Sequence, residues 1–439
     1  MQVLVLHGRS RHPNGENQRK QEQIPPCLVP QALGTLVTYV PVGRSRGGTV
    51  NIVATIGGVI VVVVTVADVV LTMVLPRRPS GIERLSLQVN RGVRVCFVLA
   101  SRLAKTYEGQ DAILAPTGPV ALVVQLLIWA AFLVLGFGLL LVGAGASFAD
   151  GLLQALTALF TVGAVHSGGP SDTGIDISVG AIWVVIVALQ IAYLPALYSS
   201  FNRREGLVAL LESRAGVPAW GPELLARHQL VGITDTLPEL YAGWEVWAAD
   251  VAESHTTYPV LLLFRSPEPW YSWLLGLIAV LDAAAMHLAL APSQASSQAR
   301  LCLRMGFTLL NRIATTLGWE VDLDPNPEGP IDLTFAEFER AVTMLEGVGF
   351  ATERSAAEAW VDFRGWRVNY ESVAYRLADR LTVPPAPWSG QRRHMRSGPV
   401  EPRRPPQRRP GGGEPFVYDR PTVVIAPRDR LIRRARPRT

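Results

Sequence analysis

The chain has 439 residues, of which 49% are hydrophobic, and its mean hydropathy is +0.24. This hydropathy is high for a soluble protein, so we expect a membrane portion attached to soluble parts. Three scattered cysteines, at positions 27, 96 and 302, share no metal or redox spacing, which argues against a disulfide framework or a zinc site. The formal net charge of +5 hides an asymmetry, because residues 383–439 hold fourteen arginines against four acidic residues.

Residues 1–48 begin MQVLVLHGRSRHPNGENQRK, a short apolar run that soon turns polar. The pattern lacks the charged start, apolar middle and small-residue cleavage site of a signal peptide. We interpret this segment as a disordered N-terminal extension and assign it no function.

Three apolar runs are long enough to cross the roughly 30 Å hydrocarbon layer as helices. They cover residues 50–75, 120–142 and 178–201, and the only charge in the first is Asp68. They predict a first transmembrane helix in residues 49–76 and two more in a module spanning residues 119–201.

Basic residues predict the orientation of these spans. Residues 76–118 hold seven basic residues against three acidic ones, and Arg203 and Arg204 follow the third span, whereas residues 143–177 contain no lysine or arginine. We therefore expect a multi-pass protein of the cell (plasma) membrane with its N-terminus outside and its C-terminal domain cytoplasmic. Within the cytoplasmic loop of residues 77–118, the segment IERLSLQVNRGVRVCFVLASRLA has helical apolar spacing with arginines between, which indicates an amphipathic helix on the inner membrane surface.

A shorter apolar stretch, ADGLLQALTALF at residues 149–160, lies between the second and third spans. It has Asp150 near its start, as a cap or first-turn acid, and as a helix would be about 18 Å long, enough to enter a membrane but not to cross it. The loop TVGAVHSGGPSDTG follows, and non-helical backbone is tolerated at membrane depth only where protein or a water-filled path surrounds it. The arrangement predicts a re-entrant pore helix with a loop at 161–167. The alternative is a helix lying flat at the outer interface with an external loop.

The loop resembles the selectivity filter of potassium channels, which typically reads T-V-G-Y-G-D and replaces the hydration shell of the ion with backbone carbonyls from four chains. Position 164 corresponds to the aromatic residue, 165 to the second glycine and 166 to the acid of that pattern. A β-branched residue reaches glycine-type backbone angles only at a cost, so weak selectivity is expected. The resemblance implies a homotetramer, K⁺ as the permeant ion and no other cofactor. The filter-like residues are Thr161, Val162, Gly163, Ala164, Val165 and His166.

Other segments resemble a group of bacterial membrane proteins that carry a potassium-channel-like pore module. They read ADVVLTMVLP, AYLPALYSSFNRREGLVALLESRAG, ESHTTYPVLLLFRSPEP and VPPAPWSG, and the resemblance covers roughly residues 50–390.

Several polar or helix-breaking residues within the predicted transmembrane helices and the filter-like loop are candidates for function. Asp68 would be a gating or ion-attracting charge, or a carboxylate paired with Arg77 or Arg78 near the interface. Gln125 and Gln190 are expected to hydrogen-bond to neighbouring helices. Pro195 is a candidate gating hinge because it removes a backbone donor and kinks helices, and a ring of His166 at the outer mouth would make permeation pH-sensitive.

Residues 202–382 predict a helical cytoplasmic domain whose many tryptophans fill a core. Residues 270–290 are apolar enough for a fourth span, but they contain Asp282 and His287, and crossing there would leave the arginine-rich tail outside. We therefore expect a buried helix at this position. The expected helices cover residues 205–215, 222–230, 238–253, 270–290, 293–317, 335–348 and 356–381.

No catalytic motif, metal spacing or glycine-rich phosphate loop is evident, so we do not expect an enzyme. Glu253 and His255 are expected to form a hydrogen-bonded helix end. The Pro- and Arg-rich tail of residues 383–439 is predicted to be disordered, and it would either bind anionic membrane lipid or only solubilise the chain, with no nucleic-acid partner. The sequence as a whole predicts an all-α membrane protein with three transmembrane helices, a re-entrant pore helix and a helical cytoplasmic domain. The expected function is passive cation permeation, and the alternative is a non-conducting scaffold or sensor that signals through the cytoplasmic domain.

Overall fold

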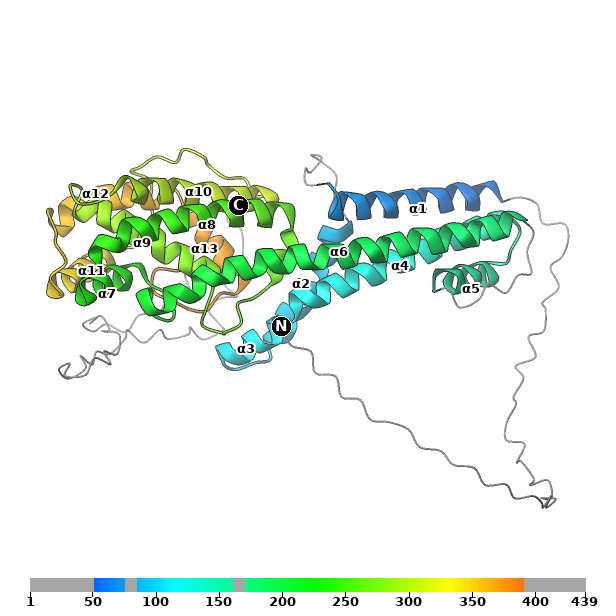
Figure 1. Cartoon of the computed structure of the whole chain (residues 1–439), viewed down its shortest axis with the longest axis horizontal. Coiled ribbons are helices and arrows are strands. Elements are labelled where there is room, and N and C mark those ends of the chain that lie inside the picture. The colour runs from blue at the N-terminus through cyan, green and yellow to red at the C-terminus, as the bar shows by residue number, and fades with distance from the viewer. Residues whose placement is uncertain (1–50, 76–84, 161–169, 391–439) are drawn as a thin grey trace, which may run out of the picture. The chain divides into compact units, whose positions relative to one another are not determined.

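The computed structural model describes residues 51–75, 85–160 and 170–390, which form helices, turns and loops without a strand (Figure 1). The expectation of an all-helical protein is confirmed for these residues. Four of their helices are long and apolar enough to cross a membrane, lying at Ile52–Met73, Tyr107–Gly143, Asp172–Ala215 and Trp273–Leu290. The predictions for residues 1–48, for the filter-like loop and for the tail beyond residue 390 fall outside the described residues.

Helices α1 (Ile52–Met73), α4 (Thr117–Gly143) and α6 (Pro170–Ala215) run together, and the shorter α5 (Phe148–Leu159) lies along α4 (Figure 1). Glycines allow the backbones of α1 and α4 to approach closely. A Cβ atom added at Gly58 would stand 2.7 Å from the carbonyl oxygen of Gly136. Small residues at such crossings are the usual means of packing helices in membranes, where lipid supplies little hydrophobic drive for association.

Helix α6 is longer than the sequence pattern indicates. The third span and the helix expected at 205–215 form one uninterrupted helix of 46 residues, roughly 69 Å at 1.5 Å per residue. The predicted domain boundary at residue 202 therefore lies within a helix. No glycine or proline separates the apolar run from the charged one, so nothing in the local sequence ends the helix there.

Helices α2 (Leu85–Ser101) and α3 (Tyr107–Leu114) connect α1 to α4. They also contact the C-terminal part of the chain. The Arg94 guanidinium donates to the Arg380 carbonyl oxygen at 2.9 Å. Arg265 forms an ion pair with Asp111 and donates to the Leu381 carbonyl oxygen at 2.8 Å. The segment expected to lie on the inner membrane surface is thus joined to the helical domain by polar contacts.

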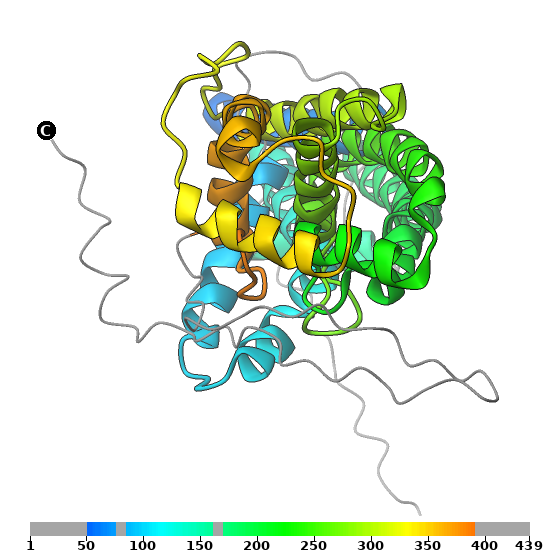
Figure 2. The ribbon, with the colours of Figure 1, turned by 90° about the vertical axis from the view of Figure 1, so that its left-hand side faces the viewer.

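The helical domain surrounds α9 (Trp273–Leu290), and all eighteen residues of α9 are buried. Figure 2 views this bundle from its end. Four of the tryptophans expected to fill a core are buried, at positions 220, 244, 247 and 273, which confirms that interpretation for them. The other elements of the domain are α7 (Gly221–Val231), η1 (Thr234–Thr236), α8 (Leu237–Thr257), η2 (Pro259–Leu263), α10 (Ser297–Thr316), α11 (Phe335–Gly347), α12 (Ala356–Arg367) and α13 (Glu371–Leu381).

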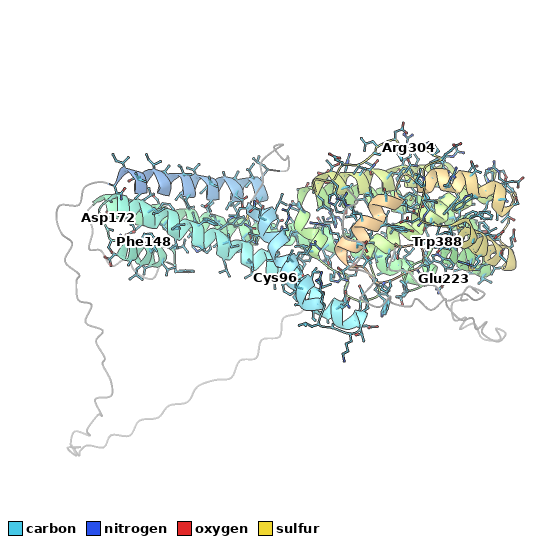
Figure 3. The ribbon with its side chains drawn as sticks, turned by 180° about the vertical axis from the view of Figure 1, so that it is seen from behind. Cys96, Phe148, Asp172, Glu223, Arg304 and Trp388 are labelled. Carbon is cyan, nitrogen blue, oxygen red and sulfur yellow. The ribbon has the colours of Figure 1, made fainter. Side chains whose placement is uncertain are left out.

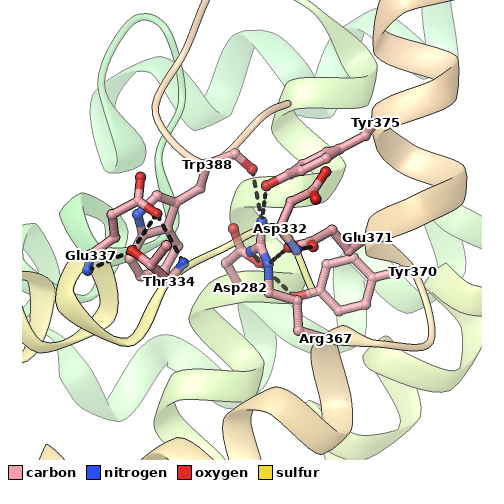
Figure 4. A network of polar contacts seen from close by, with 9 residues as sticks. All are labelled: Asp282, Asp332, Thr334, Glu337, Arg367, Tyr370, Glu371, Tyr375 and Trp388. Atoms are coloured by element: carbon pink, nitrogen blue, oxygen red, sulfur yellow. Dashed lines mark hydrogen bonds and ion pairs between the residues drawn. The ribbon is translucent and has the colours of Figure 1, made fainter. Parts of the chain in front are cut away.

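A fully buried arginine, Arg367, is the hub of a network of polar contacts in this domain (Figure 4). Its guanidinium forms ion pairs with Asp282 of α9 and Glu371 of α13, and it donates to the Trp388 carbonyl oxygen at 2.9 Å. The Tyr370 hydroxyl also donates to Asp282. Burial alone would lower the pKa of Arg367, but the facing carboxylates raise it well above its usual value, so the group stays charged.

Two predicted boundaries are wrong here. The helix expected at 356–381 is two helices, because the backbone leaves helical geometry at Tyr370, where φ is −131°. The break lies between Arg367 and Tyr370, and the side chains of both residues bond to Asp282. Residues 383–390, assigned to the disordered tail, are packed instead. Trp388 is fully buried between Trp220 and Phe363, at ring-centroid distances of 5.7 and 5.8 Å, so its apolar area outweighs the local proline-rich composition.

Candidate pore module

Helix α5 is the structural counterpart of the predicted pore helix. It begins after Ser147, whose Oγ accepts from the Asp150 N–H at 3.2 Å and donates to the Asp150 carboxylate at 2.7 Å. Asp150 is therefore the first-turn acid rather than the cap. The helix has 12 residues, roughly 18 Å in length, and ends at Leu159.

Glycines bring α5 against α4. A Cβ atom at Gly151 would lie 2.8 Å from the Gly138 carbonyl oxygen, and one at Gly138 would lie 2.8 Å from Leu152. Ala155 and Leu159 are fully buried in the core that α4 and α6 share. Through these contacts, the buried face of α5 packs along α4, which is one of the candidate spans.

Helix α6 contacts α5 at successive levels. The Gln154 amide donates to both Asp176 carboxylate oxygens, at 3.1 and 2.9 Å. Further along, a Cβ atom at Gly180 would lie 3.5 Å from the Ala158 carbonyl oxygen. The Phe160 and Trp183 rings then meet at 6.3 Å. Since the contacts advance along both helices in the same direction, the two helices run side by side and in parallel.

The filter-like residues Thr161 to His166 lie outside the described residues, so the structure brings none of them together. What it describes are both attachment points of the loop. The loop leaves the C-terminal end of α5 beside Trp183 and rejoins the chain at the N-terminus of α6.

Asp68 is buried within the membrane module, with 6% of its surface exposed. Its carboxylate accepts a hydrogen bond from the Trp129 indole N–H at 2.9 Å, which joins α1 to α4. Arg77 and Arg78, the partners considered from the sequence, lie outside the described residues. The indole partner was missed because Trp129 reads as an ordinary apolar residue of its span. Its polar N–H, which requires a partner when buried, was the available signal.

Gln125 and Gln190 both face inward, as predicted, with 5% and 8% of their surfaces exposed. Neither amide atom of Gln125 has a hydrogen-bond partner among the described residues, so the expected interhelical bond is not formed there. Both side chains line a small cavity of about 40 Å³ together with Thr72 and Tyr193. This volume accommodates one or two water molecules, which would satisfy the amide.

Pro195 lies inside α6 and is exposed. The helix continues through it to Ala215, so the proline does not end the span. Its missing N–H leaves the carbonyl of Ile191, one turn earlier, without its usual donor, and this is the local weakness on which a hinge would depend.

His255, expected at a hydrogen-bonded helix end, is completely buried in the helical domain. Its Nε2 lies 3.0 Å from a guanidinium nitrogen of Arg204, and Arg204 also donates to the Leu261 carbonyl oxygen at 3.1 Å. Burial and the neighbouring guanidinium lower the pKa of His255 well below its usual value, so the ring is neutral and accepts from Arg204. This cluster joins the C-terminal part of α6 to α8 and η2. Glu253 instead lines a large cavity.

Within the described ranges, no group of three or more histidine, cysteine or acidic side chains is placed to hold a metal ion. Comparison with known proteins finds no matching family model, no matching curated protein and no matching solved structure.

Proposed function

We propose that this protein is a potassium-channel-like membrane protein in which four copies surround a passive cation pore. The observation that best supports this proposal is that α5 lies parallel to α6 and beside it. A helix lying flat at the outer interface would cross α6 at one level, whereas α5 meets α6 at Asp176, Gly180 and Trp183 in turn. This run favours a re-entrant helix whose C-terminal end, with its negative dipole end, lies at membrane depth and attracts cations.

Three spans fit this proposal better than four. In α1 and in α6, only 22% of the apolar 18-residue stretch is buried within the chain, which leaves apolar surface for lipid or for neighbouring copies. Helix α9 offers no such surface, because its apolar 18-residue stretch is 100% buried. It also contains Asp282, which is paired to Arg367, and a charged pair of this kind is costly inside a bilayer. We therefore assign α9 to a cytoplasmic domain in the plasma-membrane protein.

The proposal requires a homotetramer, since one loop per chain cannot surround an ion. The polar groups around Asp68 and Gln125 are buried within a single chain, so they do not lie on an axis shared by four copies. The ion path of this proposal is formed by residues 161–166, with weak selectivity because Val165 stands where the family pattern has glycine.

Purified full-length chain in liposomes tests the proposal through K⁺ flux driven by a concentration gradient. We expect flux that falls about tenfold or more in Gly163→Ala, because a side chain there obstructs the filter backbone. Gly206→Ala is the matched control, since a Cβ atom at Gly206 meets nothing within 4 Å. Val165→Gly should raise the preference for K⁺ over Na⁺.

The mass of the detergent-solubilised complex gives an independent reading of the tetramer. A folded tetramer without flux would reject conduction and leave the alternative, a scaffold or sensor that signals through its helical domain. A monomer without flux would reject the pore as well.

A further inference from the structure

A cavity of about 1790 Å³ opens between α2, α10 and the C-terminal ends of α12 and α13. Its lining is rich in positive charge and contains no lysine or histidine. The arginines are Arg91, Arg94, Arg300, Arg304, Arg312, Arg354, Arg364 and Arg380, and the acidic residues are Glu253, Asp324, Glu328 and Asp362.

Most of these arginines form no ion pair with any residue that the structure describes. The Arg354 guanidinium lies 2.5 Å from the Asp362 carboxylate, which accounts for one pair. Among the described residues, no ion pair involves Arg91, Arg300, Arg304, Arg312 or Arg364, and each of these lines the cavity. A concave surface with an excess of one charge concentrates counter-ions of the opposite sign.

One wall of the cavity is a row of residues on α10. Arg300, Arg304, Thr308 and Arg312 are four residues apart and exposed, so they form a single stripe along the helix. Arg304 lies on the surface of the helical domain in Figure 3. Like charges at this spacing repel one another and destabilise an isolated helix slightly. An anion bound between these arginines would replace the repulsion with attraction.

Another part of the lining comes from α2 and α13, which are joined where the Arg94 guanidinium donates to the Arg380 carbonyl oxygen. Arg380 is held near Arg94 and Arg91, and burial together with these neighbouring charges lowers its pKa to about 10. The Nε atoms of Arg94 and Arg364 and the amide oxygen of Asn311 are buried without a partner among the described residues. Two of these three atoms are guanidinium donors of residues that line the cavity.

From this geometry we infer that the cavity binds a phosphate-bearing anion. Guanidinium groups present planar pairs of donors that match phosphate oxygens, and charge-assisted bonds of this type are the strong ones. The anion is either a soluble phosphate compound or a phospholipid headgroup, which α2 would contact if it lies on the inner membrane surface. The inference does not depend on ion conduction, because no residue of the cavity belongs to the pore module.

Two arms of one experiment distinguish the sources. In the first, full-length protein in detergent is titrated with inorganic triphosphate at low salt, and binding is followed by calorimetry. In the second, the protein is placed in nanodiscs of pure phosphatidylcholine or with added phosphatidylglycerol, and its melting temperature is compared. Saturable triphosphate binding supports a soluble ligand, and stabilisation by phosphatidylglycerol alone supports a headgroup.

The variant Arg304→Gln/Arg312→Gln is expected to weaken triphosphate binding about tenfold or more, or to abolish the phosphatidylglycerol effect. Its matched control is Arg214→Gln/Arg340→Gln, which removes the same charge from two exposed positions outside the cavity and should change either signal less than about twofold. If the first variant does not fold, Arg91→Gln/Arg300→Gln replaces it. Equal losses in variant and control, or no response in either arm, would overturn the inference.

Discussion

Helices α1 and α9 are both apolar over the length of a membrane span, yet they differ in burial. Within the chain, 22% of the apolar 18-residue stretch of α1 is buried, whereas all of the corresponding stretch of α9 is buried. Each also contains a buried aspartate. In α1, Asp68 accepts from a neutral indole on α4, while in α9, Asp282 meets the charged Arg367 and the Tyr370 hydroxyl. The comparison shows that apolar length alone does not separate a lipid-facing helix from a core helix. What covers the helix, and what partners its charge, makes the distinction.

The largest effect is expected from topology labelling, which gives an all-or-none result. Glu268 and Gln294 are exposed on either side of α9. Glu268→Cys and Gln294→Cys, introduced separately into a chain lacking Cys27 and Cys96, should both react with a membrane-impermeant thiol reagent from the cytoplasmic side only. Labelling from opposite sides would make α9 a span and remove the contrast with α1.

Loss of the buried cation should destabilise the helical domain strongly. Arg367→Ala leaves Asp282 and Glu371 buried without their partner, and breaking a buried pair in this way costs about 3–5 kcal/mol. Thermal melting followed by tryptophan fluorescence measures the effect. Arg340→Ala, at an exposed position on α11, is the control and should change stability by less than about 0.5 kcal/mol. Similar melting of the two variants would refute a central role for the ion pair.

Acid should weaken the helical domain through its buried histidines. Burial lowers the pKa of His228 and His255 and lowers that of His287 to about 4, so the unfolded chain binds protons at a higher pH than the folded chain does. The stability that the neutral rings contribute is complete above about pH 6.5 and is lost as the pH falls below it, by at most about 1.4 kcal/mol per pH unit for each histidine. Melting between pH 7 and 5.5 should show this loss, and His255→Gln, which removes one of the three histidines, should reduce it by about a third. A flat profile in the unmodified protein would contradict the assignment.

The smallest expected effect tests the membrane module. Gly58→Ala places a methyl group 2.7 Å from the Gly136 carbonyl oxygen and should cost about 1–3 kcal/mol through displacement of α4. Gly57→Ala, at the neighbouring position, meets nothing nearer than 4.0 Å and should be neutral or slightly stabilising, because alanine favours helices. Thermal melting in detergent compares the two. Equal behaviour would indicate that α1 does not pack on α4 through this glycine.

Much of the local structure could be predicted from the sequence. The lengths of α1 and α4, the short α5 and the inward position of Gln125 all follow from apolar run length and spacing, which neighbouring residues determine. The continuity of α6 past residue 202 does not follow from the sequence pattern, because composition changes there while the helix does not end. The candidate site was predictable only in outline. Its pairings, Asp68 with Trp129 and Gln154 with Asp176, join residues from different helices.

The sequence by itself determined that this is a helical protein with several stretches able to cross a membrane, because helix periodicity and hydrophobic length are local properties of the chain. Only the tertiary structure decided that α9 is enclosed, that Trp388 belongs to the core rather than to a tail, and that arginines from α2, α10, α12 and α13 line one cavity. The physical reason is common to all three. Burial and electrostatic potential at a residue are set by side chains far away in the sequence, and local composition contains no record of which of them will be neighbours.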